Sequence, residues 1–163
     1  MKQIVYEKLV SYIVENQNRF YRVAYSYTRR QEDALDAVQT TVCKALESYE
    51  AIKNADAIKT WFYRILINEC LTILKKRKKT VLLGDYSQQE EGYYDKDVGQ
   101  KEDINDELSR LEPDIQGIIR LRFFEELTLK EISCITGMNL NTVKTKLYRG
   151  LELLKENIQE ADL

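Results

Sequence analysis

The stretch LTLKEISCITGMNLNTVKTKLYRGLELL, residues 127–154, is the most informative part of the chain. Thr128, followed three residues later by Glu131, forms a capping box, which predicts that a helix begins here. Gly137 is expected to end this short helix, and Asn139 is a suitable N-cap for a second helix that begins one or two residues later. A helix of about seven residues, a tight turn with glycine and a longer helix together make the helix-turn-helix pattern of DNA-binding domains.

The second helix of this pattern has two chemically different sides. At about 100° per residue, Val143, Leu147, Gly150, Leu151 and Leu154 fall on one side, which must face a core. The other side carries groups that hydrogen-bond to base edges, and lysines flank the apolar stripe where they can reach phosphates. The candidate DNA-binding residues are Asn141, Thr142, Lys144, Thr145, Lys146, Tyr148 and Arg149. The alternative is a solvated face on an ordinary bundle helix.

The composition predicts an all-α protein of one domain or two small ones. The chain has 163 residues, of which 44% are hydrophobic and 32% are charged, as in soluble globular proteins. One proline and six glycines are too few for the turns that strands require. No apolar run is long enough to span a membrane and no signal peptide is evident, so a cytoplasmic protein is expected.

Cysteine and histidine usage argues against a metal site, a disulfide framework and acid–base catalysis. The chain has three widely spaced cysteines and no histidine. The thiols are therefore expected to be buried or half-buried apolar groups. Without histidine, a glycine-rich phosphate loop or a nucleophile motif, we expect no enzyme, no cofactor and no small-molecule substrate.

Before residue 83 the apolar residues recur at helical spacing in several segments, with a break or bend near residues 15–18. In residues 32–49 the expected buried stripe is Leu35, Val38, Val42, Ala45, Leu46 and Tyr49. The opposite, exposed row is Asp33, Asp36, Gln39, Thr40 and Cys43. A loop at residues 51–57 precedes a third strong pattern over residues 58–74, which ends in five consecutive bases, residues 75–79.

The charge distribution divides the chain into three parts. Residues 1–83 carry 15 basic and 9 acidic side chains, residues 84–107 carry 2 and 9, and residues 108–163 carry 8 and 9. The middle part has almost no aliphatic side chains, so it is expected to be a flexible acidic linker between two helical domains. Because phosphate neutralisation supplies most non-specific DNA affinity, the third part is expected to bind DNA weakly by itself.

Three segments together resemble the extracytoplasmic-function sigma factors, the small two-domain specificity subunits of bacterial RNA polymerase. They are DALDAVQTTVCKAL (33–46), WFYRILINECLTILKKRKK (61–79) and the region from residue 111 to 154, which match regions 2.2, 2.3–2.4 and 4 in order and spacing. The run TVKTKLYR (142–149) is close to the family's TVKSRLHR. The chain departs from the family pattern at Thr40, Ile67, Thr72 and Tyr148, and the changes at Ile67 and Thr72 weaken the transfer of promoter-melting residues.

The resemblance implies a role for each part. Residues 1–83 would be the region 2 domain, 84–107 the linker and 108–163 the region 4 domain that reads the −35 element. The row Asp33, Asp36, Gln39, Thr40 and Cys43 would dock on the coiled coil of the largest subunit of core RNA polymerase; a plain solvated face is the alternative. The family is usually held inactive by an anti-sigma factor, often membrane-anchored, and commonly serves envelope-stress regulons.

The resemblance also places the −10 element of promoter DNA on residues 51–79, since separated strands bind basic surfaces with stacking aromatics. Trp61 is expected in the core, so Tyr63 is the aromatic candidate. For Lys75 and Lys76 a merely solubilising helix end is the alternative to backbone contact. The full candidate set is Lys53, Asn54, Lys59, Tyr63, Arg64, Asn68, Lys75 and Lys76.

An autonomous helix-turn-helix regulator is the alternative function, because it would share residues 127–154. It would leave residues 33–46 and 61–79 without a purpose. A pure protein-binding adaptor would leave the DNA-reading helix without one.

Overall fold

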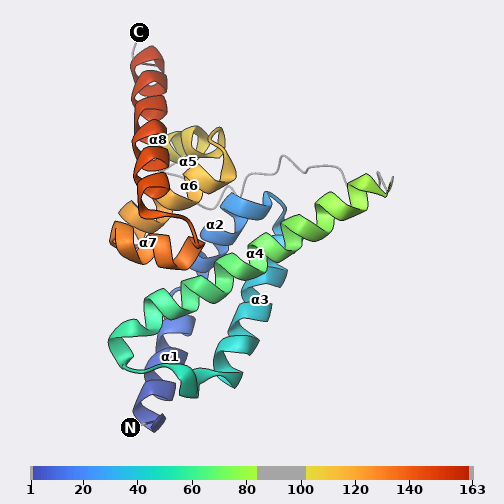
Figure 1. Ribbon diagram of the computed structural model, residues 1–163, viewed down its shortest axis with the longest axis vertical. Helices are drawn as coiled ribbons and strands as arrows, with labels where there is room; N and C mark the ends of the chain where they lie inside the picture. Colours follow the sequence, from blue (N-terminus) through green and yellow to red (C-terminus); the bar gives the residue numbers. More distant parts are fainter. Residues whose placement is uncertain (1, 84–101, 162–163) are drawn as a thin grey trace. The chain divides into compact units, whose positions relative to one another are not determined.

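The computed structural model describes residues 2–83 and 102–161, and the described residues are helical and contain no strand, which confirms the predicted all-α class. The chain divides into two compact units, Met1–Gly92 (unit 1) and Tyr93–Leu163 (unit 2) (Figure 1). None of the helices in the described ranges is long and apolar enough to cross a membrane.

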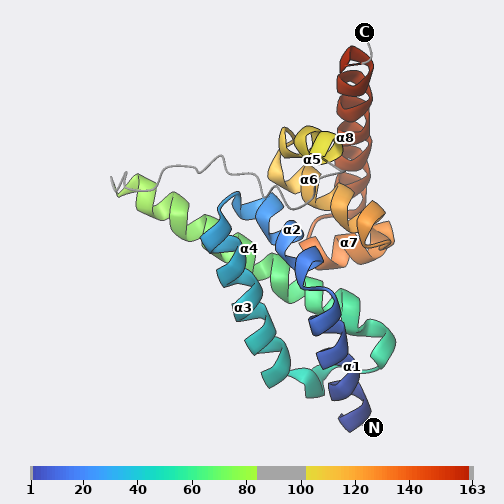
Figure 2. The ribbon, with the colours of Figure 1, turned by 180° about the vertical axis from the view of Figure 1, so that it is seen from behind.

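In unit 1, residues 2–83 form four helices and two short turns. Its helices are α1 (Lys2–Glu15), α2 (Gln17–Thr28), α3 (Gln31–Glu47) and α4 (Ile58–Leu82), and the 3₁₀ turns η1 (Tyr49–Ala51) and η2 (Ala55–Ala57) join α3 to α4. The break between α1 and α2 lies at Asn16, as predicted. Figure 2 shows α2, α3 and α4 packed together.

Aromatic rings fill the centre of unit 1. The Phe20 ring lies 4.3 Å from that of Phe62 and 5.6 Å from that of Tyr63, measured between centroids. All three side chains have no exposed surface. Tyr63 was predicted to face DNA, and that prediction is wrong for this structure because the ring completes the core between α2 and α4.

The side of helix α3 that faces the core overlaps only in part with the predicted stripe. Its buried residues are Ala34, Ala37, Val38, Thr41 and Ala45, and Leu35 is 46% exposed. Within the predicted stripe Val38 and Ala45 are buried, and Val42, Leu46 and Tyr49 are half-buried, but the inclusion of Leu35 was wrong. Alanines take part of the packed side instead, because small side chains let α3 approach α2 and α4 closely.

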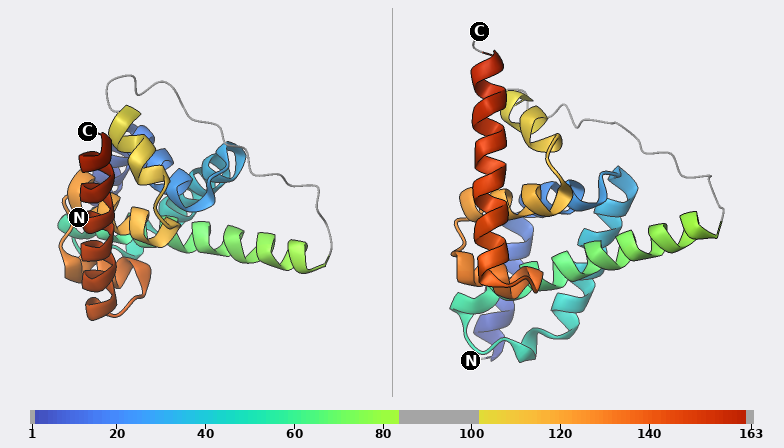
Figure 3. Two further views of the ribbon diagram at one scale, coloured as in Figure 1. Left: turned by 90° about the horizontal axis from the view of Figure 1, so that it is seen from above. Right: turned by 45° about the horizontal axis from the view of Figure 1, so that its top comes forward.

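Unit 2 consists of α5 (Glu102–Ser109), α6 (Pro113–Ile119), a π-helical turn η4 (Arg120–Phe124), α7 (Leu129–Thr136) and α8 (Leu140–Ala161). Pro113 occupies the first turn of α6, as predicted. Helix α8 packs against α5, α6 and α7 (Figure 3). Residues 102–107, which were assigned to the linker, form most of α5, and the rest of the predicted linker, residues 84–101, lies outside the described residues.

Candidate nucleic-acid interface

Both ends of α7 are closed by its own residues. The Thr128 amide donates to Glu131 Oε1 at 3.0 Å, and the Glu131 amide donates to Thr128 Oγ1 at 3.1 Å, so the predicted capping box is confirmed. Gly137 ends the helix with φ 76°, a left-handed conformation that favours glycine. The next helix is capped by Asn139, whose Oδ1 accepts from the Asn141 amide at 2.8 Å. These contacts fix the turn between α7 and α8.

Helix α8 presents the polar face expected of a DNA-reading helix. Val143 and Leu147 are buried, whereas Asn141, Thr142, Lys144, Thr145, Tyr148 and Arg149 are exposed. The Thr145 hydroxyl donates to the Asn141 carbonyl at 2.9 Å, which leaves its lone pairs free to accept. Tyr148 is 60% exposed, so its ring and hydroxyl are both accessible. The exposed set can contact base edges and phosphates together.

Lys146 differs from the other candidates on α8. Its Nζ is paired with Oδ2 of Asp114 on α6, and the two side chains are 31% and 29% exposed. The structure therefore places this lysine between two helices of unit 2 and not on the open face. This pairing could not be predicted from local sequence patterns, because the partners are 32 residues apart.

The crossing of α8 and α6 is unusually close at Gly150. A Cβ atom added to this glycine would lie 2.6 Å from Ile115 Cγ2 and 2.7 Å from Ile119 Cδ1. The absence of a side chain at residue 150 therefore sets the distance between the two helices.

On α3 the exposed row contains an apolar residue that was not expected there. Asp36, Gln39 and Cys43 are exposed, as predicted for the row, whereas Thr40 is half-buried. Leu35 lies one turn before Gln39 and shares this surface. Asp33 is the exception in the row, because Arg77 of α4 donates to its Oδ2 at 2.6 and 2.9 Å. Asp33 thus holds α3 against α4.

Most of the candidates at residues 51–79 are exposed basic or amide side chains. Lys59 and Trp61 are half-buried. Asn54 is the N-cap of η2, where its Oδ1 accepts from the Ala57 amide at 3.1 Å. The exposed members of the set are Lys53, Asn54, Arg64, Asn68, Lys75 and Lys76. With Tyr63 in the core, Trp61 is the aromatic side chain nearest to them in sequence that keeps some exposed surface.

Cysteine chemistry differs among the three thiols. Cys70 is buried, and this burial raises its pKa to about 12. Cys43 and Cys134 are exposed, so the expectation that all three would be buried or half-buried is wrong for these two. Within the described parts of the chain no group of histidine, cysteine, aspartate or glutamate side chains is arranged to hold a metal ion.

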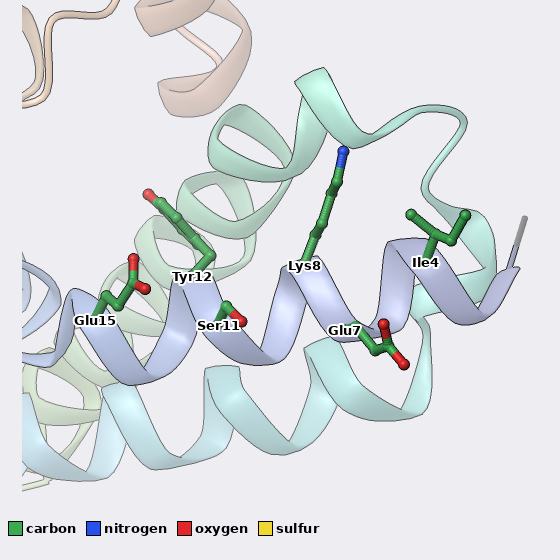
Figure 4. A pocket seen from close by; sticks show the side chains of 6 residues that line it. All are labelled: Ile4, Glu7, Lys8, Ser11, Tyr12 and Glu15. Atoms are coloured by element: carbon green, nitrogen blue, oxygen red, sulfur yellow. The ribbon is translucent and has the colours of Figure 1, made fainter.

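An open hollow of roughly 430 Å³ lies along α1 and is lined by Ile4, Glu7, Lys8, Ser11, Tyr12 and Glu15 (Figure 4). None of these residues belongs to the predicted site. The lining mixes acidic, basic and apolar groups and carries no arrangement typical of one ligand class.

Comparison with known proteins agrees with both units. Residues 12–80 match the model of Sigma-70 region 2, and residues 101–154 match the model of Sigma-70, region 4. The chain is 42% identical over 167 aligned residues to RNA polymerase sigma factor SigV of Bacillus subtilis (strain 168), an alignment covering 99% of this chain and 98% of that relative. It is 29% identical to the ECF RNA polymerase sigma-E factor of Haemophilus influenzae (strain ATCC 51907 / DSM 11121 / KW20 / Rd), with 88% and 83% covered.

The fold has a counterpart among solved structures. The sigma factor RpoE in complex with the anti-sigma factor NepR from Bartonella quintana superimposes with a TM-score of 0.75 over 91% of this chain and 97% of that one. At 22% identity this likeness shows the fold alone. The two region matches and the relative at 42% identity establish that the chain belongs to the extracytoplasmic-function sigma factors of RNA polymerase, a family of transcription initiation factors.

Proposed function

We propose that this sigma factor divides promoter recognition between its two units. Residues 1–83 dock on core RNA polymerase and read the −10 element, residues 108–163 read the −35 element, and residues 84–107 connect them. The observation that carries the proposal is the exposed polar face of α8, which is held in helix-turn-helix geometry by the caps of α7 and α8.

At the −35 element, α8 enters the major groove with its first turns. Asn141, Thr142, Thr145, Tyr148 and Arg149 face the base edges, and Lys144 lies at the side of the face where it reaches a phosphate. Arginine forms the commonest specific contact, a bidentate pair with guanine, so Arg149 is the main candidate for sequence discrimination.

On core polymerase, the exposed row of α3 docks on the coiled coil of the largest subunit. Asp36 and Gln39 supply polar contacts, and Leu35 supplies an apolar one at the edge of the row, next to Gln39. Thr40 and Cys43 complete the surface. Asp33 contributes indirectly, because its pairing with Arg77 fixes the start of α3.

At the −10 element, the surface formed by Lys53, Asn54, Lys59, Arg64 and Asn68 binds the separated strand, and Lys75 and Lys76 contact the duplex backbone. Single strands bind to cationic grooves that offer a stacking aromatic. Trp61 takes the stacking role that the sequence assigned to Tyr63, since it retains exposed surface and Tyr63 has none.

Regulation by an anti-sigma factor follows from the relatives. Two of the similar solved structures are RpoE with NepR and CnrH with the cytosolic domain of CnrY, the latter at a TM-score of 0.62. We place the present protein in the cytoplasm, held by a membrane-anchored anti-sigma factor until envelope stress releases it. Co-purification of the chain with a single-span membrane protein would test this part.

The division of labour is tested by fluorescence anisotropy with a labelled promoter duplex near physiological salt. The free chain should bind weakly, because residues 108–163 have a net charge of −1 and one lysine of the recognition helix is already paired. Adding core polymerase should produce promoter-specific binding, since both units then act on one DNA molecule. Sub-micromolar, sequence-specific binding by the free chain would instead indicate an autonomous regulator.

A further inference from the structure

The cations of the DNA-reading helix are not equivalent. Lys144 and Arg149 are exposed, whereas Lys146 pairs with Asp114 across the α6–α8 contact. The carboxylate of Asp114 is occupied at both oxygens, because Oδ1 also accepts from the Ile115 amide at 2.9 Å. This second contact fixes Asp114 at the start of α6 independently of Lys146.

We infer that Asp114 withholds Lys146 from DNA, so that this lysine positions the recognition helix instead of neutralising a phosphate. The inference rests on the proposed function, in which α8 reads the −35 element. It changes the expected count of phosphate contacts and assigns a role to a carboxylate outside the DNA-reading helix.

The direction of Lys146 on α8 supports this role. At about 100° per residue, Lys146 lies about 60° from the buried Val143 and about 100° from Thr145, which is on the open face. Gly150, one turn further on, is the point where α8 touches Ile115 and Ile119 of α6. Lys146 and Gly150 therefore face the same neighbouring helix, one through an ion pair and the other through close backbone contact.

Burial also favours the Lys146–Asp114 ion pair over a contact between Lys146 and a DNA phosphate. Both side chains are about 30% exposed, so their attraction is less screened than that between a fully exposed lysine and a DNA phosphate. If Lys146 turned to the phosphate, the half-buried carboxylate of Asp114 would lose its only charged partner that the structure records. A DNA phosphate would therefore have to compete with the ion pair that Lys146 already forms with Asp114 in the free protein.

The test is the salt dependence of promoter binding by holoenzyme reconstituted from core polymerase and the full chain. Each neutralised phosphate contributes about 0.9 to the slope of log K against log salt. Lys144→Met should lower the magnitude of the slope by about 0.9, which is about 3.5-fold in relative affinity between 50 and 200 mM salt. Lys146→Met should leave the slope unchanged and lower the melting temperature.

Asp114→Asn distinguishes withholding from simple packing. The amide keeps the acceptor for the Ile115 amide and removes the charge, so the freed Lys146 should raise the magnitude of the slope by about 0.9. The double variant Asp114→Asn with Lys146→Met should return to the wild-type slope. A packing role for Asp114 would move the melting temperature without moving the slope.

Two results would overturn the inference. If Lys146→Met lowers the slope as much as Lys144→Met does, Lys146 contacts a phosphate. An unchanged slope in Asp114→Asn would mean that the carboxylate withholds nothing. A failure of the proposed function is recognised separately, because Lys144→Met and Arg149→Ala would then both leave promoter binding unchanged. Lys146→Arg, which retains the pair, should behave as the wild type in every measurement.

Discussion

Arg77 of α4 holds the carboxylate of Asp33 at the start of α3, with Nε and Nη2 at 2.9 and 2.6 Å from Oδ2. Nη2 also donates to the Thr28 carbonyl at the end of α2, at 2.5 Å. One guanidinium thus connects three helices of unit 1. Arg77 lies in a run of five bases, and the four lysines of that run are exposed.

Arg77→Met is expected to destabilise unit 1 by about 1–3 kcal/mol, because it removes charge-assisted hydrogen bonds and leaves a partly buried carboxylate without its partner. Trp61 is the single tryptophan of the chain, so its fluorescence during urea unfolding reports on unit 1. Lys78→Met is the matched control and should change stability by less than about 0.5 kcal/mol. If both variants lose the same amount of stability, the effect comes from the net charge of residues 75–79 and not from the specific contacts of Arg77.

Gly150→Ala is expected to destabilise unit 2 by about 1–3 kcal/mol, although alanine favours the helix by about 1 kcal/mol. The new Cβ would lie 2.6 and 2.7 Å from side-chain atoms of Ile115 and Ile119. Hydrogen exchange of the α6 and α8 amides measures the effect within unit 2. Adding Ile119→Val removes the Cδ1 atom and should recover part of the lost stability. If Gly150→Ala causes no loss of stability, α6 can move to accommodate the new methyl group.

Arg149→Ala is expected to weaken holoenzyme binding to the cognate promoter by about 1–3 kcal/mol while association with core polymerase is unchanged. The control is Lys155→Ala, which removes a charge from an exposed position further along the same helix. Binding to promoters with single changes in the −35 element should show relaxed discrimination at one base pair. A parallel loss of polymerase association would give α8 a different role.

Leu35→Ala and the double variant Asp36→Ala, Gln39→Ala are each expected to lower the affinity for core polymerase by on the order of 1 kcal/mol, about fivefold in Kd. Neither should lower the melting temperature, because these side chains are exposed. Val14→Ala, which truncates a side chain on α1 that is 68% exposed, is the control. Unfolding of the variants would show that this face packs internally.

Cys70 is expected to resist thiol reagents at pH 8 until the chain unfolds, whereas Cys43 and Cys134 react at once. Burial raises the Cys70 pKa from 9.0 to about 12, so the folded state favours the neutral thiol. The unfolded chain loses this proton first, so the contribution to stability is complete below pH 9 and decreases as the pH rises towards 12. The variant Cys43→Ser, Cys134→Ser isolates this thiol in a reagent titration, and rapid labelling of the native protein would contradict the burial.

Local chemistry made the helix-turn-helix predictable from sequence. Thr128 with Glu131, Gly137 and Asn139 act through contacts within five residues, so their effects can be inferred without knowing the fold. The polar and buried sides of α8 followed from helical periodicity for the same reason.

Features that depend on distant residues were not predictable in this way. The burial of Tyr63 depends on Phe20, and the roles of Asp33 and Lys146 depend on partners 44 and 32 residues away. The buried side of helix α3 was predicted only in part because the periodicity argument ranks leucine above alanine as a core residue. Close helix packing buries the small side chains of Ala34 and Ala37 instead. The π-helical turn at residues 120–124 interrupts a segment whose apolar residues predict a continuous helix.

The closed ends of α7 have a kinetic consequence for promoter recognition. Since the capping box, Gly137 and Asn139 fix the turn in the free chain, α8 needs no ordering when it meets DNA. Association is then governed by diffusion and by the long-range attraction of Lys144 and Arg149 to phosphates, neither of which depends on base sequence. Promoters that differ in the −35 element should therefore capture this unit at similar rates and differ in how long they retain it.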